Sequence, residues 1–81
     1  MIRYDITVLK ILSDANPRMV TTSTLWSEML ISDGRASYTG FTAALRSMEE
    51  KGQLIQVKGE DRARCKITDV GIARLAEATA E

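Results

Sequence analysis

The chain has 81 residues, with eleven Lys plus Arg, eleven Asp plus Glu, no His and one Cys, so its formal net charge is zero. A chain of this length forms one domain that buries about 60–65% of the surface its unfolded form exposes. The 44% apolar and 27% charged residues are typical of a folded soluble domain and exclude a disordered or low-complexity segment.

The residue types also exclude several kinds of site. A single Cys cannot form an intramolecular disulfide, and without His there is no set of ligands for zinc and no Ser-His-Asp or Cys-His arrangement. We therefore expect no metal, no cofactor and no enzymatic activity. No apolar run of 18 residues occurs, and Asp5 and Lys10 interrupt the apolar N-terminal stretch, so we expect a cytoplasmic protein without a membrane partner.

The chain begins with a predicted helix over residues 3–15. Pro17 ends this helix, because Pro disfavours the helical conformation in its predecessor and has no N–H to donate. Residues 19–21 are too few and too β-branched for a helix and are expected to be extended. The apolar face of the first helix is formed by Ile6, Val8, Leu9, Ile11 and Leu12.

A second helix is expected to start with Thr22 or Ser23 as its N-cap and to run to about Ile31. The only Trp, Trp26, lies at a core-facing position of this helix and is expected to pack rather than to stack on a ligand. Residues 32–36 have the composition of a loop.

The third predicted helix covers residues 38–51, with Ser37 as its N-cap and Gly52 at its end. Gly40 inside it is expected to allow a close approach to another backbone. The core-facing residues at helical spacing are Phe41, Ala44, Leu45 and Met48, and the opposite side carries Tyr38, Thr39, Thr42, Ala43, Arg46 and Glu50.

After Gly52 the apolar period changes from that of a helix to that of a strand. Residues 54–58 and 63–67 predict a β-hairpin around a polar turn at residues 59–62. Cys65 in the second strand is expected to be a small, half-buried apolar residue; a redox role would require activation by its basic neighbours. Thr68 and Asp69 cap a final helix, frayed over residues 78–81, whose apolar residues are Val70, Ile72, Ala73, Leu75 and Ala76.

This order of elements is an α+β pattern that resembles the winged helix-turn-helix domain, with a three-helix core, a two-stranded β-wing and a C-terminal helix. Residues 45–55 look like a recognition helix passing into the wing. Residues 66–75 look like the passage that closes the wing in PadR-like and MarR-like bacterial regulators. The resemblance covers roughly residues 4–77, with Gln53 as an added polar residue and Asp69 in place of the usual Glu.

The zero net charge is distributed unevenly along the chain. Residues 1–34 hold three basic and four acidic groups, residues 35–66 seven and four, and residues 67–81 one and three. Residues 35–66, which contain the third helix and the hairpin up to residue 66, therefore carry a charge of +3. In winged-helix regulators this half contacts DNA, with the third helix in the major groove and the wing against the backbone or in the minor groove.

The resemblance implies a set of DNA-binding residues, and for each a solvent-exposed or structural role stays open. Tyr38, Thr39, Thr42 and Arg46 would lie over base edges and phosphates. Ser37 would offer its backbone amide to a phosphate or act only as a cap, and Arg35 would contact a phosphate or pair with Asp33. On the wing, alternate side chains would project from one face, either to phosphates or into solvent: Lys58, Arg62, Arg64 and also Lys66.

We therefore expect a single-domain protein that binds double-stranded DNA and regulates transcription. Two alternatives remain: a winged-helix module for protein–protein interaction, and an architectural accessory protein of a phage or mobile element. A weak homodimer through the first and last helices is also expected, because both carry more apolar residues than one packing face requires.

Overall fold

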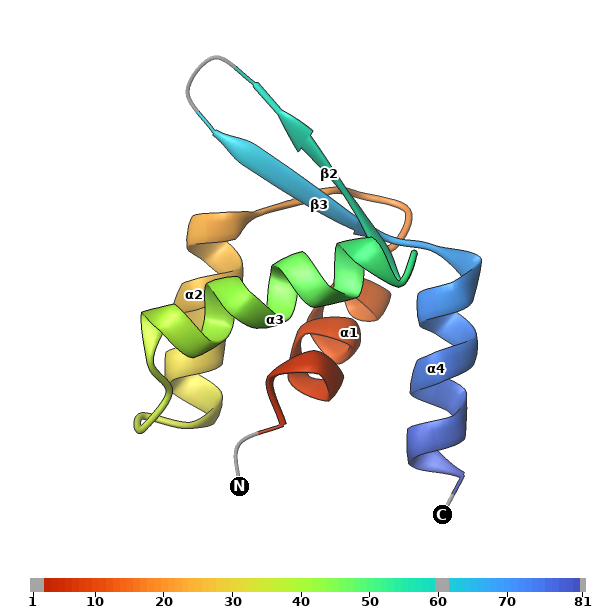
Figure 1. Cartoon of the computed structure of the whole chain (residues 1–81), viewed down its shortest axis with the longest axis horizontal. Coiled ribbons are helices and arrows are strands. Elements are labelled where there is room, and N and C mark those ends of the chain that lie inside the picture. Colours follow the sequence, from red (N-terminus) through yellow and green to blue (C-terminus); the bar gives the residue numbers. More distant parts are fainter. Residues whose placement is uncertain (1–2, 60–61, 81) are drawn as a thin grey trace.

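The computed structural model describes residues 3–59 and 62–80, so Glu60 and Asp61 of the predicted polar turn lie outside the described residues. This part of the chain forms four helices and a three-stranded antiparallel sheet, an α+β fold (Figure 1). The elements, in chain order, are α1 Tyr4–Ala15, β1 Val20–Thr21, α2 Thr22–Ser32, α3 Tyr38–Glu50, β2 Leu54–Lys58, β3 Ala63–Ile67 and α4 Asp69–Thr79.

Three of the helices begin at a hydroxyl side chain that accepts the N–H of the residue three positions on. The pairs are Thr21 with Thr24, Ser37 with Gly40, and Thr68 with Gly71. Each hydroxyl satisfies one of the N–H groups that a helix start leaves unpaired. The predicted caps Ser37 and Thr68 are confirmed. The predicted cap of the second helix is wrong by one residue, because Thr21 takes that role and Thr22 is already helical.

The helix ends mostly follow the predicted signals. α1 ends before Pro17, and Gly52 after α3 adopts a positive φ of 74°, which glycine tolerates better than other residues. The fraying expected over residues 78–81 stays a prediction. α4 continues to Thr79, whose hydroxyl donates to the carbonyl oxygen of Leu75 at 3.0 Å.

The sheet has the strand order β1–β3–β2, so the predicted two-stranded hairpin gains a third strand from the extended residues 20–21. The strands β2 and β3 extend beyond the helices (Figure 1). Residues paired across an antiparallel sheet share a face. One face, toward the helices, carries the pairs Leu54–Ile67, Gln56–Cys65 and Lys58–Ala63, and the outer face carries Ile55–Lys66 and Val57–Arg64.

This register corrects one sequence prediction. Lys58 and Arg64 were expected to project from the same face of the hairpin, but Lys58 pairs with Ala63 and Arg64 pairs with Val57. Because neighbouring residues of a strand point to opposite faces, the two cations lie on opposite faces of the hairpin. Only Arg64 shares the outer face with Lys66.

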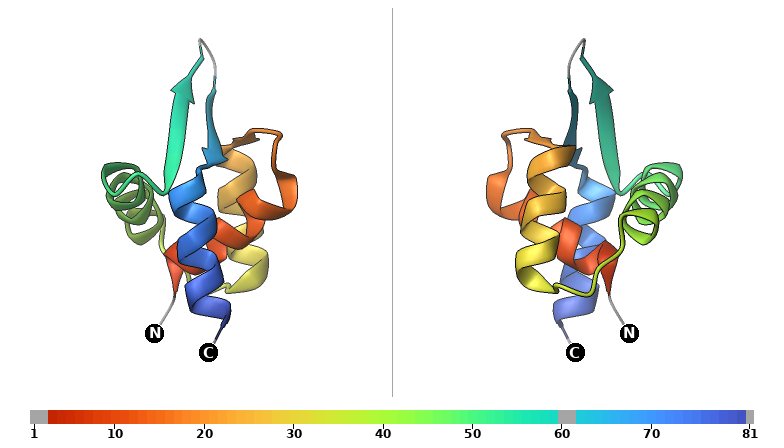
Figure 2. Two further views of the ribbon diagram at one scale, coloured as in Figure 1. Left: turned by 90° about the vertical axis from the view of Figure 1, so that its right-hand side faces the viewer. Right: turned by 90° about the vertical axis from the view of Figure 1, so that its left-hand side faces the viewer.

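The core lies between the inner face of the sheet and helices α1, α2 and α3, and Figure 2 shows α1 in the middle of this arrangement. Trp26 packs against the core, as predicted. The predicted core residues of α3 are buried, with Ala44 half-buried at their edge. The buried cluster comprises Val8, Leu9, Leu12, Val20, Leu25, Met29, Phe41, Leu45, Met48, Leu54, Cys65 and Ile67.

Helix α4 contacts α1, and its first turn approaches the backbone of Gln53 closely. Gly71 is its only buried residue, and a Cβ atom there would overlap with the Gln53 carbonyl oxygen. Val70 and Ile72 are exposed. The apolar face of α1, in contrast, is buried in the core of the same chain. The dimer was predicted from a surplus of apolar residues on both the first and the last helix, and for α1 there is no such surplus.

Candidate nucleic-acid interface

A groove of about 460 Å³ lies between α3 and β2, closed at one side by the start of α2. It brings together four of the predicted site residues: Tyr38, Thr42, Arg46 and Lys58. The remaining lining residues are Thr22, Phe41, Leu45, Glu49 and Gln56. Residues from three separate elements thus form one concave, polar surface.

The α3 wall of this groove follows from the helical period. Tyr38, Thr42 and Arg46 are four residues apart, so they form one row along the helix. The opposite side is buried through Phe41, Leu45 and Met48, which fixes the rotation of α3 about its axis and exposes the polar row. The Thr42 hydroxyl donates to the carbonyl oxygen of Thr39 at 3.1 Å. This hydrogen bond fixes the rotamer of Thr42 and therefore the direction of its methyl group.

An aromatic cluster holds α2 and α3 together beside the groove. The ring of Trp26 lies 5.4 Å from that of Tyr38 in an edge-to-face arrangement and 5.3 Å from that of Phe41. Such pairs stabilise a contact by about 0.5–1.5 kcal/mol beyond burial. Tyr38 is nevertheless 61% exposed, so one edge of its ring is anchored while the rest faces solvent.

The opposite wall is formed by the helix-facing side of β2. Leu54 is buried at the base of the strand, Gln56 is half-buried and Lys58 is exposed near the tip. Arg46 and Lys58 place cations on the two walls, while Glu49 adds a carboxylate to the α3 wall.

Sequence reasoning missed Thr22, Gln56 and Glu49 as lining residues. The two-residue strand period places Gln56 on the face of Lys58 and could have identified it. Nothing local to residues 22 or 49 signals that they meet the hairpin, because that contact depends on the packing of α2 and α3.

The segment before α3 does not line the groove, and two of its interactions bear on the predicted roles. The Arg35 side chain is 90% exposed and lies 3.6 Å from the Asp33 carboxylate. The backbone N–H of Ser37 donates to the Tyr4 hydroxyl at 2.9 Å. The proposal that this amide is free for a phosphate is therefore wrong, because Tyr4 already occupies it.

Tyr4 also accounts for the glycine inside α3. A Cβ atom on Gly40 would lie 2.8 Å from the Tyr4 hydroxyl oxygen and 3.0 Å from Oγ of Ser37. The close approach predicted at Gly40 is real, but the neighbour is a side chain of α1 and not a backbone. Tyr4 thus joins the start of α1 to the start of α3.

The other predicted site residues are exposed but lie outside the groove. Thr39 lies on α3, Arg62 lies just before β3, and Arg64 lies on the outer face of the sheet. The nine predicted residues therefore divide between the groove, the segment before α3, the exposed side of α3, and the start and outer face of β3. Arg64 and Lys58 lie on opposite faces of the hairpin and so do not share one surface.

Cys65 is fully buried under the sheet. Burial raises the pKa of its thiol to about 11, and the negative charge of Glu49 adds to this effect. Because the thiolate is the reactive form, this environment suppresses reactivity. The neighbouring cations do not activate Cys65, so the redox role considered for it is not supported.

Comparison of the chain with protein-family models, with curated proteins and with solved structures gives no match in any of the three. Over residues 3–59 and 62–80, no group of three or more acidic or Cys side chains is placed to hold a metal ion. Within the same described segments, every helix is too short or too polar to cross a bilayer.

Proposed function

We propose that the protein is a winged helix-turn-helix DNA-binding protein that regulates transcription, with α3 as the recognition helix and the β2–β3 hairpin as the wing. The observation that carries this proposal is the α3–β2 groove, where an exposed polar row of a helix faces a strand that ends in Lys58. The helix order and the antiparallel sheet are compatible with such a domain.

In this proposal α3 enters the major groove with its exposed row toward the bases. Arg46 is long enough to pair bidentately with a guanine edge, and Thr42 offers a methyl group to thymine. Lys58, on the opposite wall, contacts the phosphate backbone that borders the groove. Glu49 disfavours a phosphate at its own position but can accept a hydrogen bond from the amino group of cytosine.

The charge distribution supports the same orientation. Residues 35–66 carry +3 while the chain as a whole is neutral, so the attraction to DNA is directional. With four to six phosphate contacts, the logarithm of the affinity should fall with the logarithm of the salt concentration with a slope of roughly −4 to −5.

The experiment that tests the proposal is selection of bound sequences from a random duplex pool, followed by anisotropy titration of the enriched duplex. We expect an enriched motif. Arg46→Gln should weaken binding to it by about 1–3 kcal/mol. The matched control is Arg18→Gln, which removes the same charge from an exposed residue outside the α3–β2 groove and should leave the affinity nearly unchanged.

Equal losses of affinity in the two variants would show that the protein is attracted to DNA only by its general charge, without a specific role for Arg46. Absence of binding to any duplex at low salt would reject DNA binding altogether.

A second candidate, a protein–protein interaction module, is favoured by the outer face of the sheet. Ile55 and Val57 are 47% and 50% exposed there, next to Lys66 and Arg64. Half-exposed aliphatic side chains cannot contact phosphates electrostatically, whereas they suit the apolar core of a protein interface. An Ile55→Ser/Val57→Ser variant should keep its DNA affinity if α3 carries the function. Loss of a protein partner in this variant, with DNA affinity unchanged, would assign the outer face of the sheet to protein binding.

A further inference from the structure

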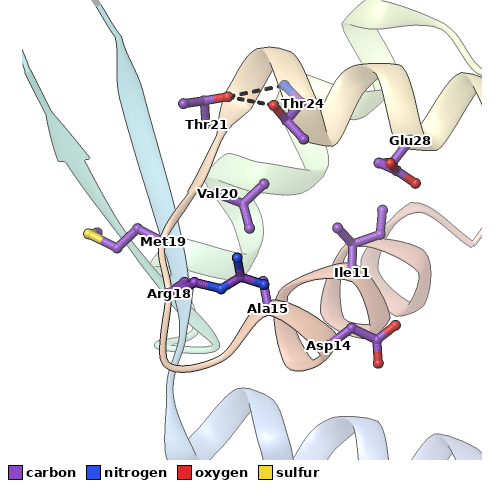
Figure 3. Close-up of a pocket in the computed structure, with 9 residues that line it drawn as sticks. All are labelled: Ile11, Asp14, Ala15, Arg18, Met19, Val20, Thr21, Thr24 and Glu28. Atoms are coloured by element: carbon purple, nitrogen blue, oxygen red, sulfur yellow. Dashed lines mark hydrogen bonds between the residues drawn. The ribbon is translucent and has the colours of Figure 1, made fainter.

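A second groove, of about 500 Å³, lies between the end of α1, the β1 segment and α2 (Figure 3). It shares no residue with the α3–β2 groove, so ligand binding there can be measured whether or not the protein binds DNA. The lining residues are Ile11, Asp14, Ala15, Arg18, Met19, Val20, Thr21, Thr24 and Glu28.

The centre of this groove is apolar. Ile11 and Ala15 are half-buried and pack against the core, and Val20 belongs to the core itself. At one edge Thr21 donates to the Thr24 hydroxyl at 2.8 Å and accepts the Thr24 N–H at 3.3 Å. The two threonines are thus engaged with one another (Figure 3), and the centre of the groove offers a ligand mainly apolar contact.

The electrostatics of the groove favour a cation at one end. Asp14 of α1 and Glu28 of α2 lie on the same side of the groove, on either side of Ile11 (Figure 3), and neither forms an ion pair with another described residue. The end of α1 adds the partial negative charge of a helix C-terminus, and its last turn contains no basic residue. The partial negative charge of the helix end repels the Asp14 carboxylate, so Asp14 does not stabilise its own helix. A bound cation would remove this repulsion.

We propose that this groove binds a small organic cation, a protonated primary amine attached to an apolar body. The apolar body would lie on Ile11, Ala15 and Val20, and the ammonium group would lie between the Asp14 and Glu28 carboxylates. The volume is within the range of about 300–1,000 Å³ that is usual for small-molecule sites. The Arg18 side chain extends from the segment before β1 toward Ala15, and its charged end lies away from Glu28 (Figure 3). Its repulsion of the ammonium group therefore favours the side of the groove that holds the two carboxylates.

Three probes of nearly equal size and different charge test the proposal: phenylbutylamine, phenylbutanol and phenylbutanoate. Each is titrated into the 81-residue protein at pH 7 and low salt while the methyl resonances are followed by NMR. We expect the amine to shift the methyl groups of Ile11, Ala15 and Val20 in a saturable way. The alcohol should bind about fivefold to tenfold more weakly and the carboxylate more weakly still, since each exposed charge pair contributes up to roughly a fivefold factor.

Two variants separate the charge effect from general hydrophobic binding. Asp14→Asn/Glu28→Gln should reduce the amine affinity to that of the alcohol, whereas Glu50→Gln/Glu77→Gln, which removes two exposed carboxylates elsewhere, should not. Arg18→Gln should tighten amine binding, because it removes a positive charge that repels the ammonium group. All of these side chains are exposed, and retained dispersion of the amide spectrum shows that each variant is folded.

Equal affinity for the amine and the alcohol would overturn the proposal, as would an unchanged affinity of Asp14→Asn/Glu28→Gln for the amine. Preferential binding of the carboxylate would assign the groove to an anion held by Arg18 and would also overturn it. No saturable shift with any probe would show that the groove is not a site for such ligands.

Discussion

Replacing Gly71 by Ala should destabilise the protein although Ala is the better helix former. Gly71 is at the third position of α4, where a Cβ atom would overlap with the Gln53 carbonyl oxygen and lie 2.8 Å from Cγ1 of Ile67. The group that would clash with the Cβ atom is a backbone carbonyl, and hydrogen bonds hold the backbone of Gln53 in place on both sides. The Gln53 carbonyl accepts the Thr68 N–H at 3.2 Å, and the Gln53 N–H donates to Met48 at 2.9 Å.

The magnitude follows from three opposing effects. Helix propensity favours Ala by about 1 kcal/mol. Overpacking against a fixed backbone costs about 1–3 kcal/mol, and a displaced Gln53 carbonyl weakens one further hydrogen bond by about 1 kcal/mol. We therefore expect a net loss of about 1–3 kcal/mol in the free energy of unfolding, which lowers the Tm of a domain of this size by roughly 4–8 °C per kcal/mol.

Urea unfolding followed by Trp26 fluorescence measures this loss. The matched control is Gly34→Ala, where the nearest heavy atom to the new Cβ is 3.9 Å away and the change should stay within about 0.5 kcal/mol. A Gly71→Ala protein as stable as wild type would refute the close docking of α4 on residue 53.

Three further predictions concern single side chains. Gln53→Met should raise the free energy of unfolding by about 1 kcal/mol in urea titration, because the Oε1 atom of Gln53 is buried with no hydrogen-bond partner among the described residues; a loss of stability would indicate a partner. Burial raises the pKa of the Cys65 thiol from 9.0 to about 11, so the folded state holds this proton more tightly and stability falls as the pH rises from 9 to 11. The slope for wild type should exceed that for Cys65→Ala by up to about 1.4 kcal/mol per pH unit, and equal slopes would contradict the burial effect. Glu49→Gln should increase affinity for non-specific duplex by removing a carboxylate from the α3–β2 groove; unchanged affinity in an anisotropy titration would place the phosphates elsewhere.

Most element boundaries could be predicted because they depend on single residues with strong local preferences. Ser37 and Thr68 are caps, Pro17 ends a helix, and Gly52 supplies the positive φ that follows α3. The structure also explains the glycine in residues 66–75, the segment that resembles the passage closing a wing. Gly71 is required because a larger residue would overlap with Gln53, and no local preference reveals this contact.

The candidate site could be predicted only in part. The polar row of α3 follows from the helical period, and its predicted exposure is confirmed. The faces of the hairpin depend on how Lys58 pairs with Ala63 across the turn, and a different turn length would exchange them. The contact of Tyr4 with Ser37 spans 33 positions, so it had no signal in the local sequence.

Chemical-shift mapping with the selected duplex tests most directly whether the α3–β2 groove binds duplex DNA. We expect the amide shifts to centre on Tyr38, Thr42, Arg46 and Lys58 and to disappear as salt is raised. Shifts centred on Ile55 and Val57, or no shifts at low salt, would contradict this expectation.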